Sequence, residues 1–389
     1  MSLLHREKRA VDLSAWITGS DSYRPSTSGE RVNSKTAMSL SAVSRAVSLL
    51  ADMASTLPLD TFRQDTHLVP RVVSSPQLVS SPSMVVSQMV WRHQLMVSWL
   101  LFGNAYGLVL TRDRQGWPTT IEWIDPSTVA AAQGSSLRRP SFQVNGVDVN
   151  PDEFFHIPGK HVPPGSALGV APLERHKETF GLALAARSFG SKWFGDGAHP
   201  SAVLSSDQVL NQEQATAMKT RFLAAVKGRR EPAVLGAGLT YTPIQSAPDE
   251  AQFLETQAAS VGDIARAFDL PPEAIGGADK GSSVTYANRE QRSQDLLTFG
   301  IDPYLTRIET DLYTENLPRP LFVKFNRAAL LRSDTATRYQ AHDSAIRAGW
   351  KTRDEVRALE DLPPIPDGSG AEALWPPYST TPTATQNGK

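Results

Sequence analysis

The chain has 389 residues, of which 40% are hydrophobic and 20% are charged, so it is long enough for two or three domains and has the composition of a folded protein. Its 39 Lys and Arg residues nearly balance 40 Asp and Glu residues, which excludes a global basic field that would grip nucleic-acid phosphates. The absence of cysteine excludes disulfides, thiolate metal ligands and a cysteine nucleophile, and it fits a reducing compartment.

Neither an export signal nor a membrane span is predicted. The first residues, MSLLHREKRA, are charged, and no apolar stretch of signal-peptide length follows them. The most apolar region runs from Met84 to Leu110, but polar residues interrupt it well short of about 18 clean apolar residues. The interrupting residues are Gln88, Arg92, His93 and Gln94. We therefore expect a protein that stays where it is made and has no membrane partner.

Residues 1–36 are rich in Ser, Thr, Gly and charge without a sustained period, which predicts a flexible arm. Residues 37–170 are predicted to form an α+β domain. Its helices are expected from Ala37 to Thr56 and from Met84 to Phe102, the second capped by Gly103. Its strands are expected at Leu59–Arg63, Ala105–Thr111, Thr120–Ile124, the two arms of FQVNGVDV around the Asn145-Gly146 turn, and Phe154–Ile157.

Two long helices flank a small insert in the next part of the chain. Residues 171–197 predict one helix from Ala171 to Phe194, with a proline tolerated in its first turn. Residues 248–270 predict a second helix from Pro248 to Phe268. The insert, residues 198–247, is expected to hold a strand at SAVLS, a helix from Gln212 to Val226, and strands at Ala233–Leu235 and Leu239–Pro243. This order predicts two antiparallel struts that carry a compact knob.

The remaining segments are a loop, a long helix, a helical pair and a tail. Residues 271–285 are loaded with Gly, Pro and Ser, which predicts a mobile loop. Residues 286–331 predict a helix from Tyr286 to Glu315, kinked at Pro303, followed by a strand at Leu321–Phe325. Residues 332–365 predict helices at Asp334–Ala348 and Thr352–Leu359, the second opened by a Thr352/Glu355 capping box, and residues 366–389 predict a disordered tail.

The loop contains a run that superficially resembles a phosphate-binding loop. The run is Gly276, Gly277, Ala278, Asp279, Lys280, Gly281, Ser282 and Ser283. A Walker loop needs Gly-Lys-Ser/Thr at the start of a helix, whereas here the lysine precedes the glycine, so nucleotide binding is disfavoured. His156 and His161 are five residues apart without a carboxylate constellation, which is typical of structural histidines. We predict no catalytic residue, no metal and no cofactor.

The densest basic cluster is Lys227, Arg229 and Arg230, in VKGRREP. A solvated turn after a helix is the favoured interpretation, because short charge runs usually have no specific partner. The alternative is a contact with DNA or with a docking protein at the tip of the knob. Tryptophans fall at apolar positions of predicted helices, which indicates core or subunit contacts. They include Trp91, Trp99, Trp193 and Trp350.

Six segments, in chain order, carry a resemblance to a known family. They are AVSRAVSLLADMASTLPLDTFR, LLFGNAYGLVLTRDRQGWPTTIEWIDPSTV, FHIPG, PLERHKETFGLALAARSFGSKWFGDGAHPSAVLS, AVLGAGLTYTPIQSAPDEAQFLETQAASVGDIARAFDLPPEAIGG and TRDEVRALEDLPPIPDG. Over residues 35–368 they resemble the HK97-type portal proteins of tailed bacteriophages. Residues 67–83, HLVPRVVSSPQLVSSPS, lack the family's usual His-Pro-Leu and Pro-Asn-Pro pattern, so the resemblance implies no structure for the local loop there.

The resemblance implies a non-catalytic subunit of a dodecameric ring at one capsid vertex, through which double-stranded DNA enters and leaves. The implied parts are a wing (37–170), two stem helices (171–197 and 248–270), a clip (198–247), a tunnel loop (271–285), a long kinked helix with a wing strand (286–331) and a helical crown (332–365). The run from Gly276 to Ser283 would face DNA. The basic cluster at Lys227, Arg229 and Arg230 would lie in the clip.

The resemblance also implies partners and a location. The large terminase would dock on the clip side, head-tail adaptor proteins would later replace it, and scaffold and major capsid proteins would contact the wing. The ring would belong to the virion and be assembled in the host cytoplasm. A closed ring would also supply the head-to-tail interfaces that long amphipathic helices need.

Two rival functions remain open at the level of sequence. An enzyme acting on nucleic acid or nucleotide is suggested by the glycine-rich loop and the basic cluster; ATP turnover or DNA cleavage that is lost when Lys280 is changed would favour it. A head adaptor or scaffold protein without a pore would share the missing catalytic motifs. Electron microscopy separates that rival, because it would not form closed rings.

Overall fold

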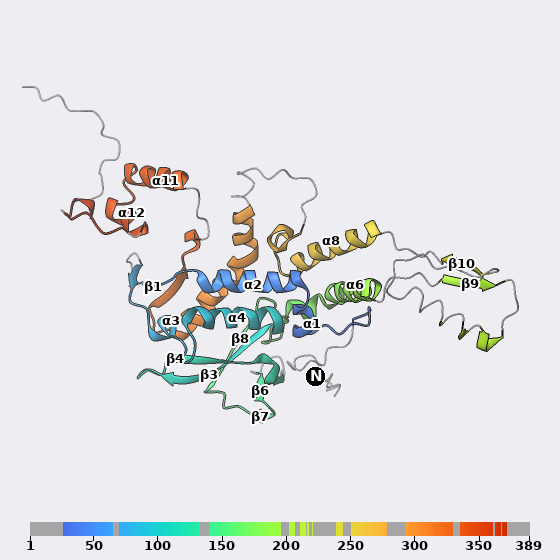
Figure 1. Cartoon of the computed structure of the whole chain (residues 1–389). Coiled ribbons are helices and arrows are strands. Elements are labelled where there is room, and N and C mark those ends of the chain that lie inside the picture. Colours follow the sequence, from blue (N-terminus) through green and yellow to red (C-terminus); the bar gives the residue numbers. More distant parts are fainter. Residues whose placement is uncertain are drawn as a thin grey trace, which may run out of the picture.

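The computed structural model of the chain is built around two buried helices, α2 (Ser41–Thr56) and α4 (Gln88–Phe102), which pack against each other (Figure 1). Both carry an apolar face that is fully buried, with Leu50 and Trp99 among the largest core side chains. The structure describes residues 26–64, 70–132, 140–195, 202–206, 211–214, 216–217, 220, 239–243, 250–277, 292–329, 335–360, 362–366 and 368–371.

Both helices begin later than the sequence pattern predicted. The chain before α2 forms a separate short helix, α1 (Ser34–Met38). A capping box between Asn33 and Thr36 starts this helix, and Ser39 caps its end. Helix α4 begins at Gln88 instead of Met84. The residues before it form a local turn, in which the Ser83 hydroxyl accepts hydrogen bonds from the Val85 and Val86 amides. At the other end of α4, the predicted Gly103 cap is confirmed, with a left-handed φ of 74°.

Antiparallel strands cover the other side of α4. The order in one sheet is β4 (Pro118–Ile124), β3 (Asn104–Arg112) and β8 (Phe154–Pro158). A second sheet contains β5 (Val129–Ala132), β6 (Ser141–Val144) and β7 (Val147–Asp148). The predicted hairpin turn between β6 and β7 is confirmed, because Asn145 and Gly146 adopt positive φ angles of 49° and 79°.

The third sheet joins distant parts of the chain. Strand β1 (Leu59–Arg63) pairs antiparallel with β2 (Arg71–Val73) on one side and with β11 (Leu321–Phe325) on the other. The Arg327 guanidinium, just after β11, contacts Glu309 at 2.6 Å, and the Phe325 amide donates to the same carboxylate at 2.7 Å. The strand predicted at Leu321–Phe325 is confirmed, and its pairing with β1 joins it to the N-terminal α+β unit.

The predicted helix from Ala171 to Phe194 is interrupted, which corrects the expectation of one continuous helix. A single turn, α5 (Pro172–Arg175), packs against α4, whereas α6 (Lys177–Gly195) packs against α8 (Glu250–Ala267). His176, with φ −113° and ψ 28°, leaves the helical conformation between them. The interruption redirects the chain from one packing partner to the other.

The antiparallel pair of β9 (Ala202–Ser206) and β10 (Leu239–Pro243) lies beyond the far ends of α6 and α8 (Figure 1). Both strands agree with the sequence prediction. The expected strand at Ala233–Leu235 and most of the helix expected from Gln212 to Val226 lie outside the described residues, as do most of residues 1–36 and 366–389.

The long helix predicted around Pro303 is irregular rather than simply kinked. A π-helical turn, η4 (Leu296–Ile301), leads into α10 (Asp302–Arg307), and a second one, η5 (Ile308–Tyr313), follows. The Asp302 amide bonds to the Leu297 carbonyl, five residues earlier. Because Pro303 has no amide hydrogen, the wider turn absorbs the missing helical bond. The predicted start of this helix at Tyr286 is outside the described residues.

The C-terminal helical pair is α11 (Thr335–Arg347) and α12 (Arg353–Leu359), and the Thr352/Glu355 capping box is confirmed. The short elements are α3 (Gln77–Ser80), η2 (Pro126–Thr128), η3 (Pro272–Ile275), η6 (Thr314–Asn316), η7 (Arg327–Ala329) and η8 (Ser369–Ala371). No helix in the described ranges is both long and apolar enough to cross a membrane.

The tryptophan predictions are met in part. Trp91 and Trp99 are buried core residues, and their indole N–H groups donate to the Ile121 and Ile157 carbonyls. Trp350 is 75% exposed in the single chain, so it is not a core residue. The side chain of Trp193 lies outside the described residues.

Candidate functional site

The candidate site begins where Gly103, Gly159 and Gly169 meet, close to the start of α5. The Gly159 amide donates to the Gly103 carbonyl at 2.8 Å. A Cβ atom on Gly169 would meet the Gly103 oxygen at 2.2 Å, and one on Gly103 would meet the Ala171 nitrogen at 2.4 Å. Three backbone segments therefore approach so closely that only glycine fits, and this contact fixes where α5 starts.

Asn104 ties the same segments together through its buried side-chain amide. Its Nδ2 donates to the Gly169 carbonyl and its Oδ1 accepts from the Gly169 amide, both at 2.8 Å. The His156 Nε2 lies 2.9 Å from the same Oδ1. Because that oxygen is an acceptor, His156 donates through Nε2. Burial lowers the pKa of His156 to about 4, so the ring is neutral at pH 7, and it stacks on Tyr106.

The geometry agrees with the prediction that His156 is structural. His161 contacts the Arg175 guanidinium at 2.7 Å, and burial, reinforced by Arg175, lowers its pKa. Within the described part of the chain, no group of three His, Cys, Asp or Glu residues could hold a metal ion. These two histidines therefore organise the junction where the chain enters α5.

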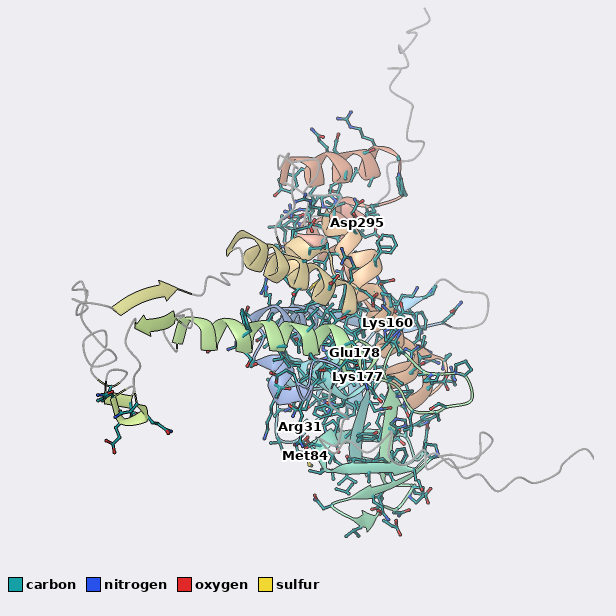
Figure 2. All side chains as sticks on the ribbon, turned by 90° about the vertical axis from the view of Figure 1, so that its right-hand side faces the viewer. Arg31, Met84, Lys160, Lys177, Glu178 and Asp295 are labelled. Atoms are coloured by element: carbon teal, nitrogen blue, oxygen red, sulfur yellow. The ribbon has the colours of Figure 1, made fainter. Side chains whose placement is uncertain are left out.

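The helix pair itself is anchored by aromatic packing. Phe180 of α6 and Phe268, which follows α8, meet edge to face with ring centroids 5.9 Å apart, and both are fully buried. Ala183 and Ile264 belong to the same core cluster. In Figures 1 and 2, α6 and α8 run side by side and extend away from the body of the molecule toward the β9–β10 strand pair.

The N-terminal segment fastens the first half of α6. The Thr27 amide donates to the Glu178 carboxylate at 2.9 Å, and the Thr27 hydroxyl donates to the same oxygen at 2.5 Å. These hydrogen bonds lower the pKa of Glu178, which Figure 2 shows at the end of α6 that lies in the body. A Cβ on Gly181 would meet the Ser26 hydroxyl at 2.2 Å. The first half of α6 is therefore held against the body of the molecule.

The predicted glycine-rich run begins directly after α8 and η3. Gly276 ends η3 with a left-handed φ of 92°, and Gly277 is packed so closely on Pro272 that a Cβ would lie 2.8 Å from its carbonyl oxygen. The other predicted residues of the run, from Ala278 to Ser283, lie outside the described residues. So does the basic cluster of Lys227, Arg229 and Arg230.

An ion pair joins the two sides of this loop. Glu273 lies before the run from Gly276 to Ser283 and Arg292 lies after it, and their charged atoms are 3.4 Å apart. The chain therefore leaves and re-enters the body at neighbouring points. Leu270, which follows α8, is buried and packs against Gly300 of η4.

Sequence analysis missed a second ion pair in this region. The Lys160 ammonium lies 2.7 Å from the Asp269 carboxylate and 5.3 Å from the centroid of the Tyr304 ring. The two charged residues are 109 positions apart, so no sequence spacing could reveal the pair. The one local signal is that an aspartate occupies the position after α8 where glycine is usual.

Comparisons with known proteins agree with this geometry. The family model described as phage portal protein matches residues 41–361. A probable portal protein of Streptomyces phage phiC31 is 31% identical over 375 residues, which cover 90% of this chain and 80% of the relative.

Solved structures show the same fold. An HK97-family phage portal protein from Corynebacterium diphtheriae matches with a TM-score of 0.57 at 22% identity, over 78% of this chain and 99% of that chain. A chain in the neck of a native gene transfer agent particle, computed with C12 symmetry, matches with a TM-score of 0.56 at 22% identity, over 91% of this chain and 99% of that chain.

Proposed function

Because this chain belongs to the phage portal protein family, we propose that twelve copies of it close into a ring at one capsid vertex and that double-stranded DNA passes through the hole. The ring would be a component of the virion and would be assembled in the host cytoplasm. It conducts DNA during packaging and ejection and catalyses no reaction.

The single observation that carries the proposal is the projecting helix pair. Helices α6 and α8 pack along each other, and the β9–β10 strand pair lies at their far ends (Figure 1). A pair of this kind leaves its outer faces for neighbouring copies, and head-to-tail contacts between copies generate a ring when the rotation closes. We propose that the pair is the stem of the ring and that residues 198–247 are the clip.

The remaining parts follow the same scheme. The sheets around α2 and α4, completed by β11, would form the wing, which contacts major capsid and scaffold proteins. The α11–α12 pair would form the crown. The run from Gly276 to Ser283 would be the tunnel loop that faces DNA. Its charged residues are Asp279 and Lys280, so its contact with DNA would be steric or through backbone groups.

The clip would dock the large terminase during packaging and head-tail adaptor proteins afterwards. Lys227, Arg229 and Arg230 are the residues proposed for this contact or for a contact with DNA. The near balance of 39 basic and 40 acidic residues supports a channel over a static DNA-binding protein, because a sliding duplex must break each phosphate contact it makes.

Electron microscopy of the purified full chain tests the proposal. We expect closed rings with a central hole. Monomers and dimers alone, under every salt and protein concentration, would contradict it and would favour the adaptor or scaffold alternative. ATP turnover or DNA cleavage by the same preparation, abolished by Lys280→Ala, would favour the enzyme alternative.

Deleting Gly277 to Ser283 tests the tunnel loop separately. We expect the rings to form normally and DNA packaging or retention to fall, because the deletion leaves the stem and wing intact. Packaging equal to that of the wild type would remove the loop's proposed role while leaving the ring unaffected.

A further inference from the structure

Lys160 stands where three elements meet. It follows β8, its ammonium bonds to Asp269 at the end of α8, and it lies over the ring of Tyr304 in α10. The backbone beside it is also fixed, because the Arg307 guanidinium donates to the Gly159 carbonyl at 2.6 Å. The Lys160 side chain is 21% exposed, so the ion pair is partly shielded from water.

Asp269 occupies the position of α8 that most favours glycine. The Leu270 amide bonds to the Ala265 carbonyl at 2.9 Å and the Asp269 amide to the Arg266 carbonyl at 3.1 Å. These two hydrogen bonds define a Schellman motif, in which the residue after the helix cap adopts a left-handed conformation. Asp269 does so, with φ 56°. A side chain at this position strains the backbone, which glycine would avoid.

From Asp269 to Gly277 the chain is held by burial, by a local hydrogen bond and by an ion pair. Leu270 and Ile275 are buried, the Gly277 amide donates to the Pro272 carbonyl at 2.8 Å, and Glu273 pairs with Arg292 across the loop. A rotation of the backbone at Asp269 would therefore carry the start of the loop with it. The orientation of Asp269 sets the direction in which the chain enters the run that begins at Gly276.

We propose that Lys160 and Asp269 are positioning residues for the chain that follows α8: their ion pair holds the strained turn after α8 and thereby fixes where Gly276, the first residue of the proposed tunnel loop, lies relative to β8. This inference rests on the proposed function, in which that loop faces DNA. It gives the carboxylate a role at a position where glycine would be less strained, since glycine offers no partner for Lys160.

Two variants separate positioning from stability. Lys160→Met removes the charge without touching the turn, and Asp269→Gly removes the carboxylate while relieving the backbone strain. The readout is the rate of tryptic cleavage at Lys280 in the full chain. We expect both variants to be cleaved roughly three to five times faster than the wild type, in line with the loss of a partly exposed ion pair. The melting temperature of Asp269→Gly should equal or exceed that of the wild type.

The matched control is Asp343→Asn, which breaks the exposed pair between Asp343 and Arg347 and should leave cleavage at Lys280 unchanged. Wild-type cleavage rates in both test variants would overturn the inference. So would faster cleavage of Asp269→Gly that is accompanied by a lower melting temperature, since that result would reflect general loosening. Failure of the wild type to form rings would count against the proposed function, and the cleavage rates would still decide the role of the pair.

Discussion

Asn104 shows how one buried side chain fixes the geometry of the glycine junction before α5. Its amide satisfies both the carbonyl and the amide of Gly169 and accepts a third hydrogen bond from His156. A buried polar group is favourable only when its partners are all present, and here they are supplied by backbone and a neutral ring. An aspartate would lack the donor that the Gly169 carbonyl requires, so the site selects for the amide.

The protonation of His156 should make the fold sensitive to acid. Its pKa is about 4 in the folded protein and 6.5 in an unfolded chain, so the unfolded state takes up the proton first as the pH falls. The free energy of unfolding is unaffected above pH 6.5 and should decrease by at most about 3 kcal/mol between pH 6.5 and 4.

Urea unfolding at several pH values measures this loss. The control is His156→Leu, which should be less stable at pH 7, because Asn104 loses a partner, but should lose less stability over the same pH interval. If the two proteins showed the same pH dependence, His156 would not be the titrating group.

The glycine junction predicts opposite outcomes for the same substitution at two positions. Gly169→Ala would place a Cβ 2.2 Å from the Gly103 carbonyl oxygen and should lower stability by about 3 kcal/mol or more, because backbone cannot move aside. In Gly262→Ala the nearest atom is the flexible Arg266 guanidinium at 3.9 Å, so the helix should gain up to about 1 kcal/mol. Thermal unfolding of both variants decides the matter, and a stable Gly169→Ala would refute the close approach.

Among whole elements, the paired helices depend on contacts from separate parts of the chain. Thr27 holds the beginning of α6 through Glu178, and the Arg187 guanidinium donates to the Ser39 carbonyl. Phe180 and Phe268 then lock α6 to the end of α8. The base of the pair is thus part of the core, and its direction is set by the body of the molecule.

Phe268→Leu should weaken the base of this pair. The substitution removes the edge-to-face contact with Phe180 and leaves the site imperfectly filled, at a cost of about 1 to 2 kcal/mol. Amide hydrogen exchange in α8 should become faster. The same change at Phe299, whose side chain is 67% exposed, should alter stability by less than about 0.5 kcal/mol. Equal effects at both positions would contradict the assigned role of the aromatic pair.

Sequence patterns predicted the existence of most elements but not their interruptions. The apolar period of α4 and the strand-forming residues of β3 and β4 are local signals, and these elements exist as predicted, with bounds that differ by one to four residues. The break at His176 was missed because no proline or glycine marks it, and the polar residues around it, 174–179, are compatible with a helix. It exists because α5 and α6 pack against different helices, which is a property of the assembled core.

At the level of the whole molecule, the balance of charge limits how the protein can interact with DNA. The formal net charge of −1 at pH 7 means that the chain carries no overall excess of basic charge. A duplex inside the proposed ring would therefore meet few strong phosphate contacts. Weak contacts suit a channel, because movement must break them repeatedly.

Duplex binding by preassembled rings should accordingly depend weakly on salt. Raising NaCl from about 50 to about 200 mM should reduce the affinity less than about tenfold, whereas six to ten phosphate contacts would reduce it roughly a thousandfold or more. Fluorescence anisotropy with a labelled linear duplex measures the slope. A steep slope would point to a static DNA-binding surface, and Lys227→Ala, Arg229→Ala and Arg230→Ala would show whether the basic cluster provides it.

Local patterns and ordered motifs were enough to predict most elements in their order, the capping and turn residues such as Gly103 and Asn145, and the family, because these depend on neighbouring residues or on motifs kept in order. The pairing of β11 with β1, the contact of Asn104 with Gly169 and the contact of Lys160 with Asp269 could be found only in the folded chain. These contacts bring together residues far apart in the chain, and their positions depend on how every intervening element packs, which no local pattern encodes.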